Sequence, residues 1–191
     1  CGINSTWDGT DTNVQTSIEK SQIPGIEIET EIGEYDHYKY ALHFPRTESV
    51  EINEEIQNFI SEQRQQFLKL AQSIEIEEGL FSELNLDYEV NHISAHFLSI
   101  IFTTTMNIPN SDSTSTIYTL NFNRHTDSIL SLEDILYDEN SLEYLQELSQ
   151  RQLLQNNELV DLVKAGKLSD GISPKLENYE TFSLLDQSLN F

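Results

Sequence analysis

Strict alternation of apolar and polar residues is the feature that most constrains the fold of this chain. It recurs in three separate segments, which are residues 38–44, 84–90 and 116–122. Because successive side chains of a β-strand point to opposite faces, this period of two predicts strands that bury one face. The segment 94–106 carries apolar residues on both faces, which predicts a central strand covered on both sides.

A further strand is expected to begin after Pro24 and Gly25. Its isoleucines would face the core, and the glutamates between them, Glu27, Glu29 and Glu31, would face solvent. Gly33 can turn the chain, so this strand is expected to pair antiparallel with residues 38–44.

Helical spacing of apolar residues appears first between residues 53 and 71, where Asn53 is the expected N-cap. Ser131 and Asp134 fit an acidic capping box, and further helices are predicted over 141–153 and 158–165, the last closed by Gly166. Strands and helices come in blocks. The predicted fold class is therefore α+β, with antiparallel sheets and helices packed on one face.

The chain is divided by composition into three parts. Residues 1–23 are rich in small polar residues and are interpreted as a flexible tether. Residues 24–106 and 107–191 are predicted to form two small α+β subdomains, and the second is expected to be truncated at its C-terminus.

The cysteine count bears on attachment to a membrane. Cys1 is the single cysteine of the chain, so no intramolecular disulfide is possible. A cysteine at position 1 followed by Gly2 is typical of a mature bacterial lipoprotein, and the prediction is a lipid anchor on Cys1. An arbitrary boundary of the chain is the alternative. No run of 18 apolar residues is present, so the lipid would be the sole membrane attachment.

The net charge of the chain limits the classes of molecule that it can bind. The chain has 33 acidic and 10 basic residues, with a formal net charge of -23. Such a field repels DNA, RNA and anionic membrane surfaces, whereas it attracts cations and basic proteins. A charge that only keeps the protein dispersed is the other reading, because net charge bears on solubility and association rates and not on fold.

Motifs for catalysis and for metals are weak. His92 and His96 have the spacing of a helical zinc pair, but on a strand they would lie about 13 Å apart, too far to share one ion. No Gly-x-Ser-x-Gly nucleophile elbow and no phosphate-binding glycine loop occur. A catalytic triad assembled from distant residues is compatible with any composition. We expect no catalytic residue, metal or cofactor.

Three motifs in order resemble a known family. They are Tyr118–Asn123, then Thr126–Leu136 with its Leu132-Glu133-Asp134-Ile135-Leu136 segment, and finally Asn178–Leu184. The order resembles the paired uncharacterised extracellular domains of lysozyme-responsive anti-sigma factors, which also precede the catalytic domain of some peptidoglycan deacetylases. The resemblance covers residues 26–191. Residues 108–113 replace a Gly-Ala-His-Pro-like loop of that family, and the aromatic strand that usually continues the family pattern after Phe191 is missing.

The resemblance implies a non-catalytic exported binding module at the bacterial cell surface or cell wall, with lysozyme as the candidate basic partner and no nucleic acid. The polar loop is the predicted contact: Asn107, Ile108, Pro109, Asn110, Ser111 and Asp112. One alternative is an accessory domain of a peptidoglycan-modifying enzyme, close to peptidoglycan. A structural lipoprotein without a soluble ligand is the third hypothesis.

Overall fold

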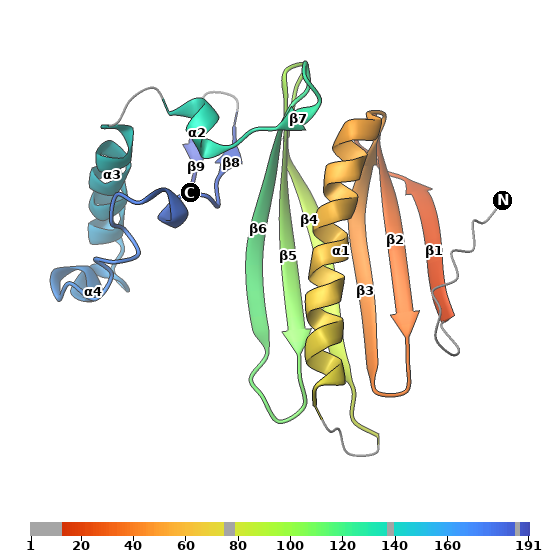
Figure 1. Ribbon diagram of the computed structural model, residues 1–191. Coiled ribbons are helices and arrows are strands. Elements are labelled where there is room, and N and C mark those ends of the chain that lie inside the picture. The colour runs from red at the N-terminus through yellow and green to blue at the C-terminus, as the bar shows by residue number, and fades with distance from the viewer. Residues whose placement is uncertain (1–12, 75–78, 137–139, 186–187) are drawn as a thin grey trace.

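A seven-stranded sheet with one long helix across it forms most of the structure. The computed structural model describes residues 13–74, 79–136, 140–185 and 188–191. In Figure 1 the helix α1 (Val50–Gln72) lies against one face of the sheet, and the C-terminal helices stand beside the sheet. The strands are β1 (Asn13–Lys20), β2 (Ile26–Glu34), β3 (Tyr38–Thr47), β4 (Ser82–Ile93), β5 (Phe97–Asn107), β6 (Thr114–Asn123) and β7 (Ser128–Ile129). These findings confirm the α+β class.

Spatial order in the sheet follows sequence order from β1 to β7. All neighbouring pairs are antiparallel except β3 and β4, which are parallel. Parallel neighbours need a long crossover, and the 23-residue helix α1 supplies it. The sheet is therefore mixed, whereas the alternation in the sequence had suggested antiparallel pairing throughout.

The start of α1 differs from the prediction. Ser49 is the N-cap, and its hydroxyl accepts a hydrogen bond from the Ile52 amide at 3.2 Å. The Asn53 side chain instead accepts from the Thr47 amide at 2.8 Å, so it fixes the turn between β3 and α1. Asn53 as N-cap was wrong because asparagine serves equally well in a turn. The end of the helix in the low seventies is confirmed.

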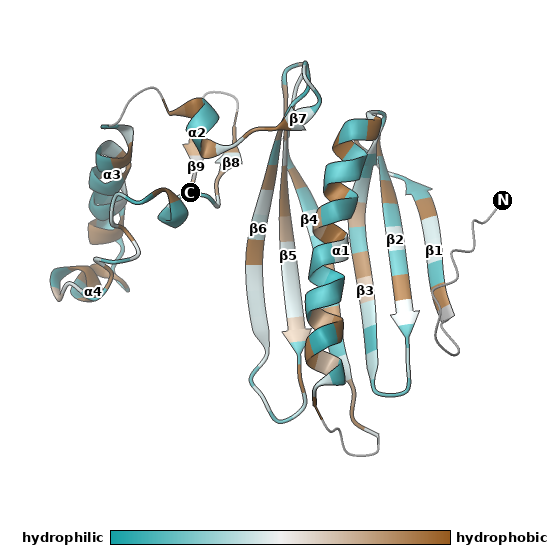
Figure 2. Ribbon diagram, viewed as in Figure 1, coloured by the Kyte–Doolittle hydropathy of each residue, from teal (hydrophilic) through white to brown (hydrophobic). Residues whose placement is uncertain are grey.

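The main core lies between α1 and the strands β3 to β6. Its largest fully buried side chains include Phe44, Phe67, Phe102 and Phe122, which come from three strands and the helix. Figure 2 shows mostly hydrophilic residues on the side of α1 that faces away from the sheet. Burial of the apolar stripe of α1 stabilises the sheet at about 25 cal/mol per Å² of apolar surface removed from water.

The prediction of a flexible tether up to residue 23 is wrong for residues 13–20. These residues form β1, which pairs with β2 over eight positions. The sequence pattern did not predict this strand because it is an edge strand whose residues 14–20 are all exposed, so it has no buried apolar face. Val14 and Ile18 are its exposed apolar residues. Cys1 and the other residues up to 12 lie outside the described residues.

The C-terminal section begins after β7 and has its own small core. It contains α2 (Leu132–Ile135), α3 (Ser141–Gln155), α4 (Val160–Lys164), a 3-10 helix (Leu176–Asn178), β8 (Ser183–Leu184) and β9 (Leu189–Asn190). The buried residues of this core are Leu132, Leu145, Tyr179, Phe182 and Leu184. The capping box of Ser131 and Asp134 is confirmed, as is the left-handed conformation of Gly166 after α4.

The expected boundary between residues 106 and 107 falls inside the β5–β6 hairpin. Those two strands pair over ten positions, so one sheet continues across the boundary. The buried residues do form two separate clusters, but the chain passes from one to the other later than expected. Phe122 still belongs to the main core of the sheet and α1, whereas Leu132 belongs to the small C-terminal core.

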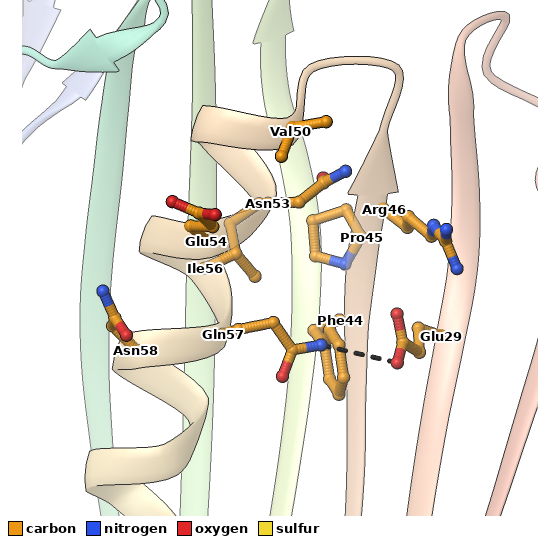
Figure 3. A pocket seen from close by; sticks show the side chains of 10 residues that line it. All are labelled: Glu29, Phe44, Pro45, Arg46, Val50, Asn53, Glu54, Ile56, Gln57 and Asn58. Atoms are coloured by element: carbon orange, nitrogen blue, oxygen red, sulfur yellow. Dashed lines mark hydrogen bonds between the residues drawn. The ribbon is translucent and has the colours of Figure 1, made fainter. Parts of the chain in front are cut away.

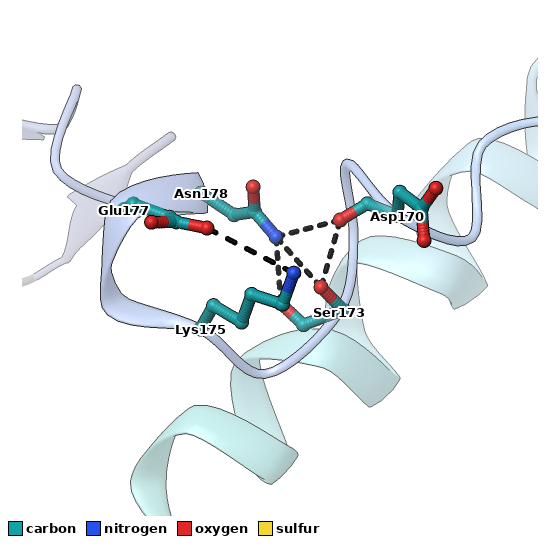
Figure 4. Close-up of polar contacts among 5 residues, drawn as sticks. All are labelled: Asp170, Ser173, Lys175, Glu177 and Asn178. Atoms are coloured by element: carbon teal, nitrogen blue, oxygen red, sulfur yellow. Dashed lines mark hydrogen bonds and ion pairs between the residues drawn. The ribbon is translucent and has the colours of Figure 1, made fainter.

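The side chains of Asn178 and Tyr179 hold a loop of the C-terminal section, residues 170–173. Figure 4 shows Asn178 directed at the backbone of residues 170–173. Its Nδ2 donates to the carbonyl oxygens of Asp170 at 2.8 Å and Ser173 at 3.0 Å. The Tyr179 hydroxyl adds a bond to the Ile172 carbonyl at 3.0 Å. These bonds take the place of regular secondary structure between α4 and the 3-10 helix.

Polar side chains of the sheet hold the C-terminal strand β8. Asn121 Nδ2 donates to the Phe182 carbonyl at 2.8 Å, and the Leu184 amide donates to Ser99 Oγ at 3.0 Å. Ser99 and Asn121 are themselves bonded at 2.7 Å. Asn91 Nδ2 donates to the Leu184 carbonyl at 2.8 Å. Three strands thus bind a segment more than sixty residues later in the chain.

This arrangement makes Asn121 a test of how the C-terminal section is attached. Asn121→Ala leaves the buried Phe182 carbonyl and the Ser99 hydroxyl short of partners, so the free energy of unfolding is expected to fall by about 1–3 kcal/mol. Urea denaturation measures it, and hydrogen exchange at the Leu184 amide should quicken. Asn58→Ala, which removes an exposed amide from α1, is the control. Equal stabilities of the two variants would contradict the role of Asn121.

Candidate functional site

A polar groove runs along the side of α1 that faces β2. Figure 3 shows that its lining side chains come from β2, β3 and the first half of the helix. The groove has a volume of about 490 Å³. Five of the ten lining side chains are carboxylates or amides, and Arg46 lies at the β3 side; the other four are apolar, namely Phe44, Pro45, Val50 and Ile56. Such a lining places hydrogen-bonding groups and two carboxylates beside apolar surface.

Glu29 is an ionisable group of the groove whose pKa is raised above its usual value. Burial raises the pKa of its carboxyl group, although the charge of Arg46 and a hydrogen bond from Gln57 act in the opposite direction. Gln57 Nε2 donates to Glu29 Oε1 at 3.4 Å, as the dashed line in Figure 3 marks. A half-buried carboxylate with a single weak donor keeps free lone pairs, so it can accept hydrogen bonds from a ligand.

Next to the groove, Glu31 is buried and paired. Its side chain receives hydrogen bonds from the Arg64 guanidinium and, at 3.0 Å, from the Tyr40 hydroxyl. Burial, followed by the charge of Glu31, raises the pKa of Tyr40 well above its usual range. Burial alone would lower the pKa of Arg64, but the hydrogen bond and charge of Glu31 outweigh it and raise the pKa. The three groups therefore tie β2, β3 and α1 together as a charged unit.

Gly33 lets Tyr40 reach this unit. A Cβ atom at Gly33 would lie 2.3 Å from Cζ of the Tyr40 ring, so any larger residue would push the ring away. The ring of Tyr40 therefore lies directly on the backbone of β2, and its hydroxyl reaches Glu31 two residues earlier. The glycine here serves close approach, and the turn expected at this position comes after Glu34.

The expectation that Glu27, Glu29 and Glu31 face solvent is wrong for Glu31, which is only 9% exposed. The register pairs Glu29 with Phe44 and Glu31 with Leu42, so these glutamates share the face that α1 covers. The isoleucines of β2 occupy the other face. Alternation gives the period of a strand, but it does not show which face meets the helix. Arg64, the charged partner of Glu31, lies 33 positions later in the chain, so no local pattern in the sequence indicated the correct face.

The predicted contact loop forms the β5–β6 hairpin connection. Asn110 adopts a left-handed conformation with φ of 63°, and the Ser111 amide donates to the Ile108 carbonyl at 3.1 Å. Asn107, Ile108 and Pro109 are half-buried, whereas Asn110, Ser111 and Asp112 are exposed. Figure 1 places this loop at the lower end of the sheet, away from the groove beside the start of α1. A role in partner contact stays a prediction.

Histidines are distributed over both ends and one face of the sheet. His37 is exposed in the β2–β3 turn, and His43 shares a hydrogen bond of 2.9 Å with Thr30. His92 lies in β4. His96 and His125 come from different turns, and their rings are in contact with centroids 4.7 Å apart. Sequence spacing could not predict this pair, because 29 positions separate its members.

Among the residues described, no group of three or more His, Cys, Asp or Glu side chains has the geometry to hold a metal ion. Within the same residues, no helix combines the length and the apolar character needed to cross a membrane.

The raised pKa of Glu29 predicts how the stability of the protein depends on pH. Its carboxyl group takes up a proton more readily in the folded state, so burial of the charge costs stability above the folded pKa, and this cost disappears as the pH falls. Glu29→Gln should therefore stabilise the protein at pH 8, by an amount that shrinks toward pH 5 in urea denaturation. Glu54→Gln removes one exposed charge from the same groove and is the control. A Glu29→Gln effect that grows as the pH falls would contradict the assignment.

Comparison with known proteins places the chain beside one curated relative. No family model matches. Peptidoglycan-N-acetylmuramic acid deacetylase PdaC of Bacillus subtilis (strain 168) is 24% identical over 168 residues, which cover 86% of this chain and 35% of the relative. The chain therefore spans about a third of the length of the curated relative that it matches.

Solved structures agree on the fold. A DUF3298 family protein from Pseudomonas aeruginosa PAO1 superposes with a TM-score of 0.54 at 14% identity, covering 82% of this chain and 71% of that protein. A member of the same family from Bacteroides fragilis NCTC 9343 gives a TM-score of 0.52 at 13% identity, covering 94% and 80% of the two chains. The chain therefore has the fold of these DUF3298 family structures, and its sequence is related to part of a peptidoglycan deacetylase.

Proposed function

We propose that this chain is a non-catalytic accessory module that acts beside a peptidoglycan-modifying enzyme at the bacterial cell surface. The observation that carries the proposal is the unequal coverage of the match to PdaC, which includes most of this chain but only 35% of the deacetylase. A segment that matches only part of a larger enzyme can serve binding or positioning, and the remaining length of the enzyme can hold the catalytic domain.

The architecture supports a positioning role. The sheet, α1 and the C-terminal section are joined by the Glu31–Arg64–Tyr40 unit and by the side chains that bind β8. Such cross-links favour a stiff body, which can present a second domain at a fixed distance from a wall or membrane. A lipid on Cys1 would hold this body at the membrane, and this attachment is part of the proposal.

A second candidate function is the binding of a basic protein such as lysozyme. The observation in its favour is the groove lined by Glu29 and Glu54 in a chain with a net charge of -23. Complementary charge raises the rate of encounter and excludes acidic competitors, while a small buried patch sets the affinity. The exposed residues Asn110, Ser111 and Asp112 are the proposed contact at the other end of the sheet.

The accessory role is tested by exchange of domains. We expect the chain alone to release no acetate from peptidoglycan. In PdaC, deletion of the segment matched by this chain should lower deacetylation of insoluble peptidoglycan more than that of soluble fragments, because positioning matters chiefly on a solid substrate. Replacement of the segment by this chain should restore the lost activity. Acetate release by the chain alone, or a deletion without effect on either substrate, would overturn the proposal.

Binding of a basic protein is tested by calorimetric titration with lysozyme at about 150 mM salt, where screening limits unspecific attraction to about 8 Å. One-to-one binding to lysozyme, and weaker or no binding to a control protein of similar positive charge, is the expected result. Glu54→Gln and Asp112→Ala then locate the contact in the groove or in the loop, because each removes one exposed carboxylate. Equal binding of both basic proteins would reject this function.

A further inference from the structure

Two exposed histidines meet at the end of the sheet where α1 begins. His96 lies in the turn between β4 and β5, and His125 lies in the turn between β6 and β7. Nδ1 of His96 and Nε2 of His125 share a hydrogen bond of 2.5 Å, in which one ring donates and the other accepts. Both rings are exposed, so neither nitrogen is required to satisfy a buried group of the core.

The backbones of the two turns are joined, which fixes the pair of histidines. The Arg124 amide donates to the His96 carbonyl at 2.8 Å, and the Arg124 guanidinium reaches the Ser94 carbonyl. The Ser94 amide closes its own turn on the Phe97 carbonyl at 2.9 Å. Asn123 accepts from the His125 amide at 2.9 Å. These bonds fix the backbones of the two turns relative to each other, so the two rings start from a defined separation.

Two facing imidazole nitrogens are suited to bind a metal ion. Each ring needs only a lone pair on the facing nitrogen, and the neutral ring has one in the correct tautomer. For an ion such as Zn²⁺, with nitrogen ligands at about 2.1 Å in a tetrahedral arrangement, the nitrogens would lie about 3.3 Å apart. A rotation of the exposed rings that moves each facing nitrogen by less than about 1 Å provides that separation. The edge of the Phe97 ring, with its centroid 6.3 Å from that of His96, is a neighbouring aromatic contact.

We propose that His96 and His125 form a binding site for a divalent transition-metal ion of the Zn²⁺ class. Imidazole nitrogen favours Zn²⁺, Ni²⁺ and Cu²⁺ over Ca²⁺ and Mg²⁺, which prefer oxygen ligands. The negative field of a chain with a net charge of -23 raises the concentration of cations at the surface. Two protein ligands leave the other coordination positions to water or to a ligand from a bound molecule. The site departs from the expectation that the chain binds no metal.

Calorimetric titration with Zn²⁺ at about 150 mM salt is the test, in a Cys1→Ser background so that the thiol does not compete. We expect one saturable site, at least tenfold weaker in both His96→Gln and His125→Gln. His37→Gln removes an exposed histidine from the β2–β3 turn, at the opposite end of the sheet in Figure 1, and should leave binding unchanged. Ca²⁺, titrated in parallel, measures diffuse binding to carboxylates.

Imidazole NMR signals give a second readout. Zn²⁺ should shift the ring nitrogens of His96 and His125 and leave those of His37 in place. The proposal is overturned by absence of saturable Zn²⁺ binding, by equal affinities of the wild type and both histidine variants, or by equal losses in the His37→Gln control. Failure of the accessory role would leave this result untouched, because the titration involves neither peptidoglycan nor an enzyme.

Discussion

Packing of α1 against the sheet is the interaction on which the rest of this structure depends. Its apolar stripe meets β3, β4, β5 and β6 in one core, with Ile56, Ile60 and Phe67 fully buried. The same helix is the connection between β3 and β4, so it also makes that pair parallel. Removal of the helix would expose the apolar face of the sheet and separate its two halves.

The position of α1 also decides which charged side chains of β2 are buried. Because the helix covers the face of β2 that carries glutamates, one of them is buried against Arg64 and another borders a groove. A buried ion pair contributes little net stability, since desolvation of both charges offsets their attraction, but its geometry is specific. Glu31, Arg64 and Tyr40 therefore act chiefly to fix the angle between helix and sheet. The raised pKa of Glu29 has the same origin in partial burial.

The C-terminal section is attached by a different kind of contact. Side chains of Asn91, Ser99 and Asn121 bind the backbone of β8, so polar hydrogen bonds replace the apolar packing that joins α1 to the sheet. Buried polar contacts of this kind accept one register only, because a shift leaves donors and acceptors unpaired. A section attached in this way keeps a defined orientation, as an accessory module beside an enzyme requires.

The sequence by itself determined the α+β class, the strands β3 to β6, the end of α1 and the capping box at Ser131, because these depend on local periodicity and local hydrogen bonds. Local patterns contain no signal for contacts between distant residues. Only the tertiary structure therefore decided that residues 13–20 form an edge strand, that β3 and β4 run parallel, that Glu31 is buried, and that His96 meets His125. In each case the deciding partner lies on another strand, helix or turn.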